Sequence, residues 1–100
     1  MKLYDVIVAG ATGMVGRKMI QVLEERKFPV GKLIPMASPR SAGHTVSFNG
    51  KNWTVEELNE ENIKRSGAQI ALFSAGGSVS KVFAPICAKH GIVVIDNSSA

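Results

Sequence analysis

Three glycines at three-residue spacing follow the first apolar segment and constrain the fold of this chain more than any other feature. Residues 6–9 are a run of four apolar residues, and Gly10, Gly13 and Gly16 come directly after it. The first glycine allows a tight reversal, the second removes a side chain where backbone would approach a phosphate, and the third lets a helix lie close to the strand. The N-terminus of such a helix directs free N–H groups at an anion. The pattern predicts a strand, a turn and a helix that together bind a dinucleotide pyrophosphate.

The residues after this turn have the period of an amphipathic helix. Four apolar residues recur at helical spacing, namely Val15, Met19, Val22 and Leu23. The glycine spacing is G-x-x-G-x-x-G rather than the commoner G-x-G-x-x-G, and glycines alone would also suit a tight connection that binds nothing. Strand, turn and helix occur in the required order, which favours the dinucleotide interpretation.

Strands and helices continue to alternate along the chain. Three further apolar segments predict strands, at residues 32–37, 70–73 and 92–95. Pro35 indicates an edge or irregular start for the first of these. A helix is predicted from about Val79 to His90, with one apolar side made of Val82, Phe83, Ile86 and Cys87 and a glycine after its basic last turn.

A hairpin interrupts this alternation. Asn49 and Gly50 separate two β-rich segments, which predicts a type I′ turn, and residues 56–64 predict a short polar helix at the surface. The whole pattern is typical of an α/β protein with a Rossmann-like, doubly wound, mostly parallel sheet and a small β-hairpin insertion. A complete dinucleotide fold needs more than 100 residues, so we expect residues 1–100 to be an incomplete domain.

Composition narrows the class of protein. The net charge is +4, and the twelve Lys and Arg residues are scattered, whereas a nucleic-acid-binding surface needs a basic stripe. Apolar runs of about four residues are far shorter than the roughly 20 of a membrane helix, and no secretion signal is visible. A single cysteine suits a reducing compartment. We expect a cytoplasmic protein that binds small ligands and contacts neither nucleic acid nor a membrane.

Cysteine and histidine residues give no sign of a catalytic or metal site. Cys87 lies on the apolar side of a predicted helix, so an inert core thiol is expected. His44 has no partner at the spacing of a metal site or general base, and His90 suits a helix C-terminus. We predict no catalytic residue and no metal ligand in these residues.

The end of the second predicted strand indicates which dinucleotide is bound. NAD-binding proteins usually carry Asp or Glu there to accept hydrogen bonds from the ribose, and no acidic residue occurs between Lys27 and Lys51. The loop instead offers Ser38, Arg40 and Ser41, whose guanidinium and hydroxyl groups suit a 2′-phosphate. NADP is therefore predicted, although a solvated loop that happens to carry an arginine remains an alternative.

Two further strand ends carry polar or small residues. Ser74, Ala75 and Gly76 form a second strand-to-helix turn, which would lie beside the first turn if their strands are neighbours. Asn97 follows the last predicted strand. Ordinary turn and helix-cap chemistry is an alternative explanation for these residues.

Four segments in this order resemble the amino-terminal part of bacterial aspartate-semialdehyde dehydrogenases. They are Gly10-Ala-Thr-Gly-Met-Val-Gly16, Ala37-Ser-Pro-Arg-Ser-Ala-Gly43, Ala71-Leu-Phe-Ser-Ala-Gly-Gly-Ser-Val-Ser80 and Val94-Ile-Asp-Asn-Ser-Ser-Ala100. The resemblance implies an NADP-dependent enzyme of lysine, threonine and methionine biosynthesis, including the diaminopimelate route. In that family a cysteine thiolate attacks the aldehyde, hydride passes to NADP, and phosphate cleaves the thioester with help from a histidine.

The resemblance assigns cofactor contacts to particular residues. The pyrophosphate turn corresponds to Thr12, Gly13, Met14 and Val15. Arg40 and Ser41 correspond to the 2′-phosphate contact, and Gly76 to a turn beside the nicotinamide. The family's catalytic cysteine and histidine lie beyond the similar region, and Cys87 does not match the nucleophile. We therefore expect the N-terminal portion of an NADP-binding domain, catalytically inactive by itself, from an enzyme that forms a homodimer.

Two alternatives remain open at this point. The related N-acetyl-glutamyl-phosphate reductases of arginine biosynthesis are the nearest enzymes, but the loop from Arg40 to Gly43 fits them less well. The chain could also be a non-catalytic dinucleotide-binding fragment or module.

Overall fold

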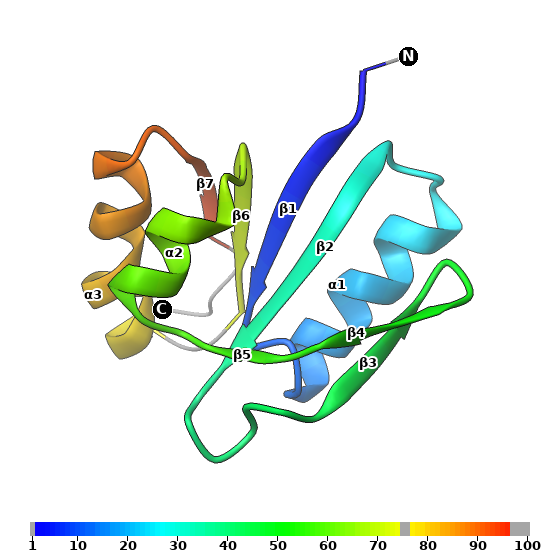
Figure 1. Cartoon of the computed structure of the whole chain (residues 1–100), viewed down its shortest axis with the longest axis horizontal. Helices are drawn as coiled ribbons and strands as arrows, with labels where there is room; N and C mark the ends of the chain where they lie inside the picture. Colours follow the sequence, from blue (N-terminus) through cyan, green and yellow to red (C-terminus); the bar gives the residue numbers. More distant parts are fainter. Residues whose placement is uncertain (1, 75–76, 97–100) are drawn as a thin grey trace.

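The computed structural model describes residues 2–74 and 77–96 as a parallel sheet with helices on both faces and a separate hairpin (Figure 1). Five strands form the sheet in the order β5-β2-β1-β6-β7, and β3 and β4 form an antiparallel pair. The elements are β1 (Tyr4–Ala9), α1 (Met14–Glu25), β2 (Val30–Ala37), β3 (Thr45–Phe48), β4 (Lys51–Thr54), β5 (Glu56–Glu57), α2 (Glu60–Ser66), β6 (Ile70–Phe73), α3 (Gly77–Lys89) and β7 (Val93–Asp96). The predicted Rossmann-like sheet with a hairpin insertion is confirmed.

Strand β1 is the centre of the sheet. It pairs in parallel with β2 on one side and β6 on the other, and Val6 to Ala9 have no exposed surface. Side chains alternate along a strand, so Ile7 packs with α2 and α3 on one face while Val6 and Val8 pack with α1 and the hairpin on the other. This double burial explains why the segment is apolar without interruption.

The hairpin forms as predicted. Asn49 and Gly50 have φ values of 51° and 78°, the positive pair that a type I′ turn requires. Phe48 is buried against the α1 face of the sheet, and the Trp53 indole Nε1 donates a hydrogen bond to the Phe48 carbonyl over 3.1 Å. The hairpin therefore covers part of the sheet face beside α1.

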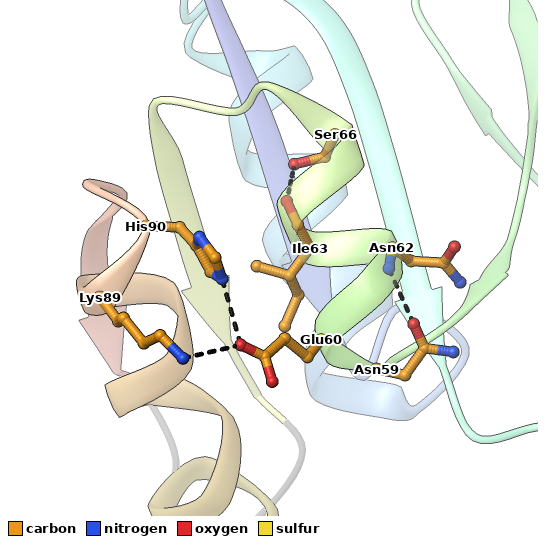
Figure 2. Close-up of polar contacts among 7 residues, drawn as sticks. All are labelled: Asn59, Glu60, Asn62, Ile63, Ser66, Lys89 and His90. Atoms are coloured by element: carbon orange, nitrogen blue, oxygen red, sulfur yellow. Dashed lines mark hydrogen bonds and ion pairs between the residues drawn. The ribbon is translucent and has the colours of Figure 1, made fainter.

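Polar contacts join α2 to the end of α3 on the opposite face (Figure 2). The Asn59 side chain caps α2 by accepting a hydrogen bond from the Asn62 N–H over 2.8 Å. Glu60 accepts a hydrogen bond from Lys89 Nζ over 3.1 Å and lies 3.2 Å from His90 Nε2. The bonds from Lys89 and then His90 lower the pKa of the Glu60 carboxyl below its ordinary value.

The predicted helix over residues 56–64 is wrong at its start. Glu56 and Glu57 form β5, which pairs with Met36 and Ala37 of β2, and the helix begins only at Glu60. Asn59 explains the delay, because its side chain caps the helix N-terminus. β5 thus pairs with a segment that lies twenty residues earlier in the sequence. No pattern in the neighbouring residues predicts this pairing.

One residue on the predicted apolar side of each long helix is exposed, whereas Phe83, Ile86 and Cys87 of α3 pack in or against the core as predicted. Val15 is 47% exposed and Val82 is 57% exposed, although both were assigned to the apolar sides. In α1 the buried residues are Gly16 and Ile20. A Cβ at position 16 would overlap Gly10 and Ala11, so α1 packs against the turn at Gly16, which is buried, while Val15 faces outward.

Candidate functional site

The carboxyl ends of β1, β2 and β6 meet at one edge of the sheet and surround a cleft. Ala9 of β1 lies between Met36 of β2 and Phe73 of β6. A cavity of about 530 Å³ opens at this edge. Its lining comes from five segments of the chain: Gly10, Thr12, Gly13, Ala37, Ser38, Pro39, Leu58, Ser74, Val79 and Phe83. This is the place where parallel α/β sheets bind ligands.

Gly10 makes the sharp turn that leads from β1 into the cleft. Its φ is +88°, a conformation that side chains with a Cβ rarely adopt. The Gly10 N–H donates to the Met36 carbonyl over 2.8 Å, and the Gly10 carbonyl accepts from the Gly13 N–H over 3.1 Å. The turn is therefore held by hydrogen bonds on both sides.

Gly13 and Gly16 are glycines for different reasons. A Cβ on Gly16 would lie 2.0 Å from the Gly10 carbonyl oxygen, so the contact between helix and turn requires a glycine. A Cβ on Gly13 would lie 3.5 Å from the same oxygen, which is ordinary contact, and Gly13 has a φ of −78°. Packing does not require a glycine at position 13, and its exposed backbone lines the cleft.

The N-terminus of α1 points its free N–H groups at the same place. Gly13 is the N-cap and provides no side-chain cap, and the first turn of the helix contains no acidic residue. The first N–H groups of a helix have no acceptor within it, so an external anion suits this end. Met14 and Val15 are exposed and do not line the cleft, so their side chains lie outside it while their N–H groups belong to the first turn.

Ser74 ties the end of β6 to the glycine turn. Its backbone N–H and its hydroxyl each donate to the Ala9 carbonyl over 3.0 Å, and the hydroxyl lies 3.3 Å from the Gly10 carbonyl. β1 and β6 are therefore neighbours in the sheet, as the prediction for this turn requires. Three other predicted contacts, Ala75, Gly76 and Asn97, lie outside the described residues.

The loop after β2 meets the glycine turn through one hydrogen bond between side chains. Thr12 Oγ1 donates to Ser41 Oγ over 3.2 Å. Ser38 lines the cleft, whereas Arg40 is exposed and does not line it. Within residues 2–74 and 77–96, no salt bridge involves Arg40. Its guanidinium therefore has no carboxylate partner in the described part of the chain.

Several cleft residues were not predicted from the sequence. Leu58, Val79 and Phe83 give the cleft an apolar wall that suits a flat ring such as adenine. Phe83 has a sequence signal, because it lies on the inward side of a predicted helix. Leu58 has none: it reaches the cleft because its N–H donates to the Ala37 carbonyl over 2.8 Å, beside β5.

Cys87 has the properties of a core residue. Its side chain is fully buried, and this burial raises the pKa of the thiol to about 11. At neutral pH almost none of it is thiolate, so it is a poor nucleophile. Across the residues that the structure places, no helix is long and apolar enough to cross a membrane, and no group of three His, Cys, Asp or Glu residues could hold a metal ion.

Comparison with known proteins gives a consistent set of relatives. Residues 5–100 match the family described as "Semialdehyde dehydrogenase, NAD binding domain". The chain is 59% identical over 96 residues to the aspartate-semialdehyde dehydrogenase of Shewanella violacea. The aligned region covers 96% of this chain and 28% of that protein. It is also 59% identical over 97 residues to the aspartate-semialdehyde dehydrogenase of Aquifex aeolicus, covering 97% of this chain and 28% of the relative.

A solved structure shares the fold closely. The crystal structure of aspartate semialdehyde dehydrogenase II from Vibrio cholerae, complexed with ASA, superposes with a TM-score of 0.91 at 49% identity. The match covers 98% of this chain and 31% of that structure. The chain thus spans less than a third of the length of the relatives that it matches.

Proposed function

The chain belongs to the semialdehyde dehydrogenase NAD-binding domain family, and from that premise we propose that it is the cofactor-binding part of an NADP-dependent aspartate-semialdehyde dehydrogenase. The reaction is the reversible reductive dephosphorylation of aspartyl phosphate to aspartate 4-semialdehyde. The names of the relatives favour this activity over the related N-acetyl-glutamyl-phosphate reductases. Within this chain the buried thiol of Cys87 is unsuited to nucleophilic attack, so we assign these residues cofactor binding and no catalytic step.

The observation that carries the proposal is the free space over Gly13. Packing and backbone conformation demand a glycine at positions 10 and 16, but neither demands one at position 13. Its missing side chain leaves backbone open to the cleft, next to a helix N-terminus that has no cap. A pyrophosphate group would satisfy these N–H groups. The bound cofactor supplies a hydride acceptor or donor; Gly10, Thr12, Gly13 and the Met14 and Val15 amides would hold its phosphates.

The proposal of NADP rather than NAD rests on charge. No acidic residue lines the cleft among the described residues, and none occurs between Lys27 and Lys51. Arg40 is exposed and has no carboxylate partner in that part of the chain, and Ser38 and Ser41 place hydroxyls on the same loop. A bound 2′-phosphate would accept hydrogen bonds from this guanidinium and these hydroxyls. The ribose diol of NAD would leave the guanidinium without an anionic partner.

Titration of the complete protein that contains this chain tests the choice of cofactor. Nicotinamide fluorescence follows binding of NADPH and NADH under the same salt conditions. We expect NADPH to bind at least about tenfold more tightly, which is the scale of one hydrogen bond to a charged group. Equal affinities for the two cofactors would refute the assignment of a 2′-phosphate site.

Assembly and location form part of the same proposal. We propose further that the complete protein is a homodimeric cytoplasmic enzyme of the pathway to lysine, threonine and methionine, as the resemblance to aspartate-semialdehyde dehydrogenases implies. Light scattering on the complete protein should give twice the mass of one chain. A deletion strain that needs diaminopimelate, threonine and methionine should grow without them when it carries the gene, and failure to restore growth would contradict the activity.

A further inference from the structure

A second cavity lies beside the cleft, between the start of α1 and the start of the hairpin. Its volume is about 550 Å³. Arg17 and Ile20 of α1 form one wall, and Ser41, His44 and the first residues of β3 form the other. Neither Arg17 nor His44 was among the residues predicted to bind the cofactor. The fold places them together because the hairpin packs on the same sheet face as α1 (Figure 1).

The second cavity and the cleft share a wall. Thr12 lines both, and its hydroxyl donates to Ser41 Oγ over 3.2 Å. Along the loop after β2, Ser38 and Pro39 line the cleft while Ser41 lines the second cavity. The two cavities are therefore adjacent at Thr12, and successive residues of this loop line the cleft and then the second cavity.

The charges around the second cavity favour an anion. Among the described residues that line it, none is a carboxylate, and Arg17 contributes a guanidinium. No salt bridge joins Arg17 to an acidic group within residues 2–74 and 77–96. Arg17 also lies in the early part of α1, where the helix dipole is positive. A planar guanidinium beside two hydroxyls is a donor set suited to the oxygens of a phosphate.

We propose that the second cavity receives the 2′-phosphate of NADP and that Arg17, with the hydroxyls of Thr12 and Ser41, selects NADP over NAD. This inference rests on the proposed function and makes Arg17 a second selecting cation in addition to Arg40. The pyrophosphate uses the backbone N–H groups at the start of α1, and the 2′-phosphate uses a side chain from the next turn of the same helix. Arg40, which is exposed on the loop, approaches from the solvent side.

Replacement of Arg17 in the complete protein tests the inference. Arg17→Ala should weaken NADPH binding by about tenfold or more, because a charge-assisted contact to the phosphate is lost. NADH has no 2′-phosphate, so its dissociation constant should stay within about twofold. Arg17→Lys keeps the charge without the planar fork and should lie between wild type and Arg17→Ala.

Lys18→Ala is the matched control. It removes the same charge from the neighbouring position of α1, but Lys18 does not line the second cavity. Both cofactors should bind this variant within about twofold of wild type. An equal loss of NADPH affinity in Arg17→Ala and Lys18→Ala would show a general effect of charge and would overturn the inference.

A smaller pair of ligands isolates the phosphate. Adenosine 2′,5′-bisphosphate and adenosine 5′-monophosphate differ only by the 2′-phosphate, so calorimetry with both measures that group directly. Arg17→Ala should reduce the affinity ratio of the two ligands by about tenfold or more. An unchanged ratio in Arg17→Ala, with wild type still preferring the bisphosphate, refutes the role of Arg17 and leaves the proposed function intact. If the wild-type protein binds the two ligands with equal affinity, the assignment of NADP as the cofactor is refuted.

Discussion

The glycine turn after β1 and the loop after β2 lie at the same edge of the sheet, but they are built differently. The turn consists of backbone: Gly10 needs a positive φ, and Gly16 lies where a Cβ would meet a carbonyl oxygen at 2.0 Å. The loop offers side chains, of which Arg40 is exposed and Ser41 accepts a hydrogen bond from Thr12 of the turn. Gly10 and Gly16 are therefore fixed by backbone conformation and by packing, whereas Gly13 of the turn and the side chains of the loop should be replaceable with little loss of stability.

The largest expected effect is on stability, in Gly16→Ala. The added methyl group meets backbone atoms of Gly10 and Ala11, which cannot move without displacing α1 from the sheet. Overpacking of this kind costs about 1–3 kcal/mol, and the contact with backbone favours the upper end. Urea unfolding measures the loss. If the variant unfolds at the same urea concentration as wild type, the turn is not built into the core as described.

Gly13→Ala should separate binding from stability within the same turn. Its Cβ makes only ordinary contact with the protein, so the free energy of unfolding should change by less than about 1 kcal/mol. The methyl group occupies the space proposed for the pyrophosphate, so NADPH and NADH should both bind about tenfold more weakly. Gly16→Ala is the reference, because it should lose stability first. Unchanged affinity for both cofactors would remove the main support for the proposed function.

Arg40→Ala should change selection alone. NADPH binding should weaken by about 1.5 kcal/mol or more, the scale of a hydrogen bond to a charged group, while NADH binding stays unchanged. Arg40 is exposed and forms no salt bridge in the described part of the chain, so stability should change by less than about 0.5 kcal/mol. Fluorescence titration and urea unfolding of the same sample measure both quantities. A loss of stability without a change in the preference for NADPH would contradict the expectation that the loop acts in selection and not in packing.

The smallest expected effect is the coupling between turn and loop. Thr12→Val and Ser41→Ala each remove one side of their hydrogen bond. A double-mutant cycle should give a coupling energy of about 0.5–1.5 kcal/mol in unfolding, as for a hydrogen bond between neutral groups. Additive effects of the two changes would mean that loop and turn act independently.

The parts of the site that could be predicted are those with a local signal. The glycine spacing, the apolar run before it and the Asn49-Gly50 turn each report on neighbouring residues, and the structure has the strand, helix and hairpin that they predict. The loop of Ser38 and Ser41 was also found locally, because it follows a strand directly. Its role in binding stays a prediction.

The parts that were missed depend on packing between distant segments. Leu58 reaches the cleft through β5, a strand of two residues that exists only because it pairs with β2. Arg17 and His44 share a cavity only because the hairpin folds onto the α1 face. Val15 is exposed for a similar reason, since the contact of Gly16 with Gly10 and Ala11 turns Gly16 inward in place of its apolar neighbour.

The sequence by itself determined the order of strands and helices, the dinucleotide turn and the absence of an acid where NAD would need one. Those properties follow from residue period and spacing, which act over a few residues. Only the tertiary structure decided that Val15 and Val82 face outward, that Leu58 lines the cleft and that Arg17 lines the same cavity as Ser41. These depend on contacts between segments that are far apart in the chain, and local patterns carry no information about such distances.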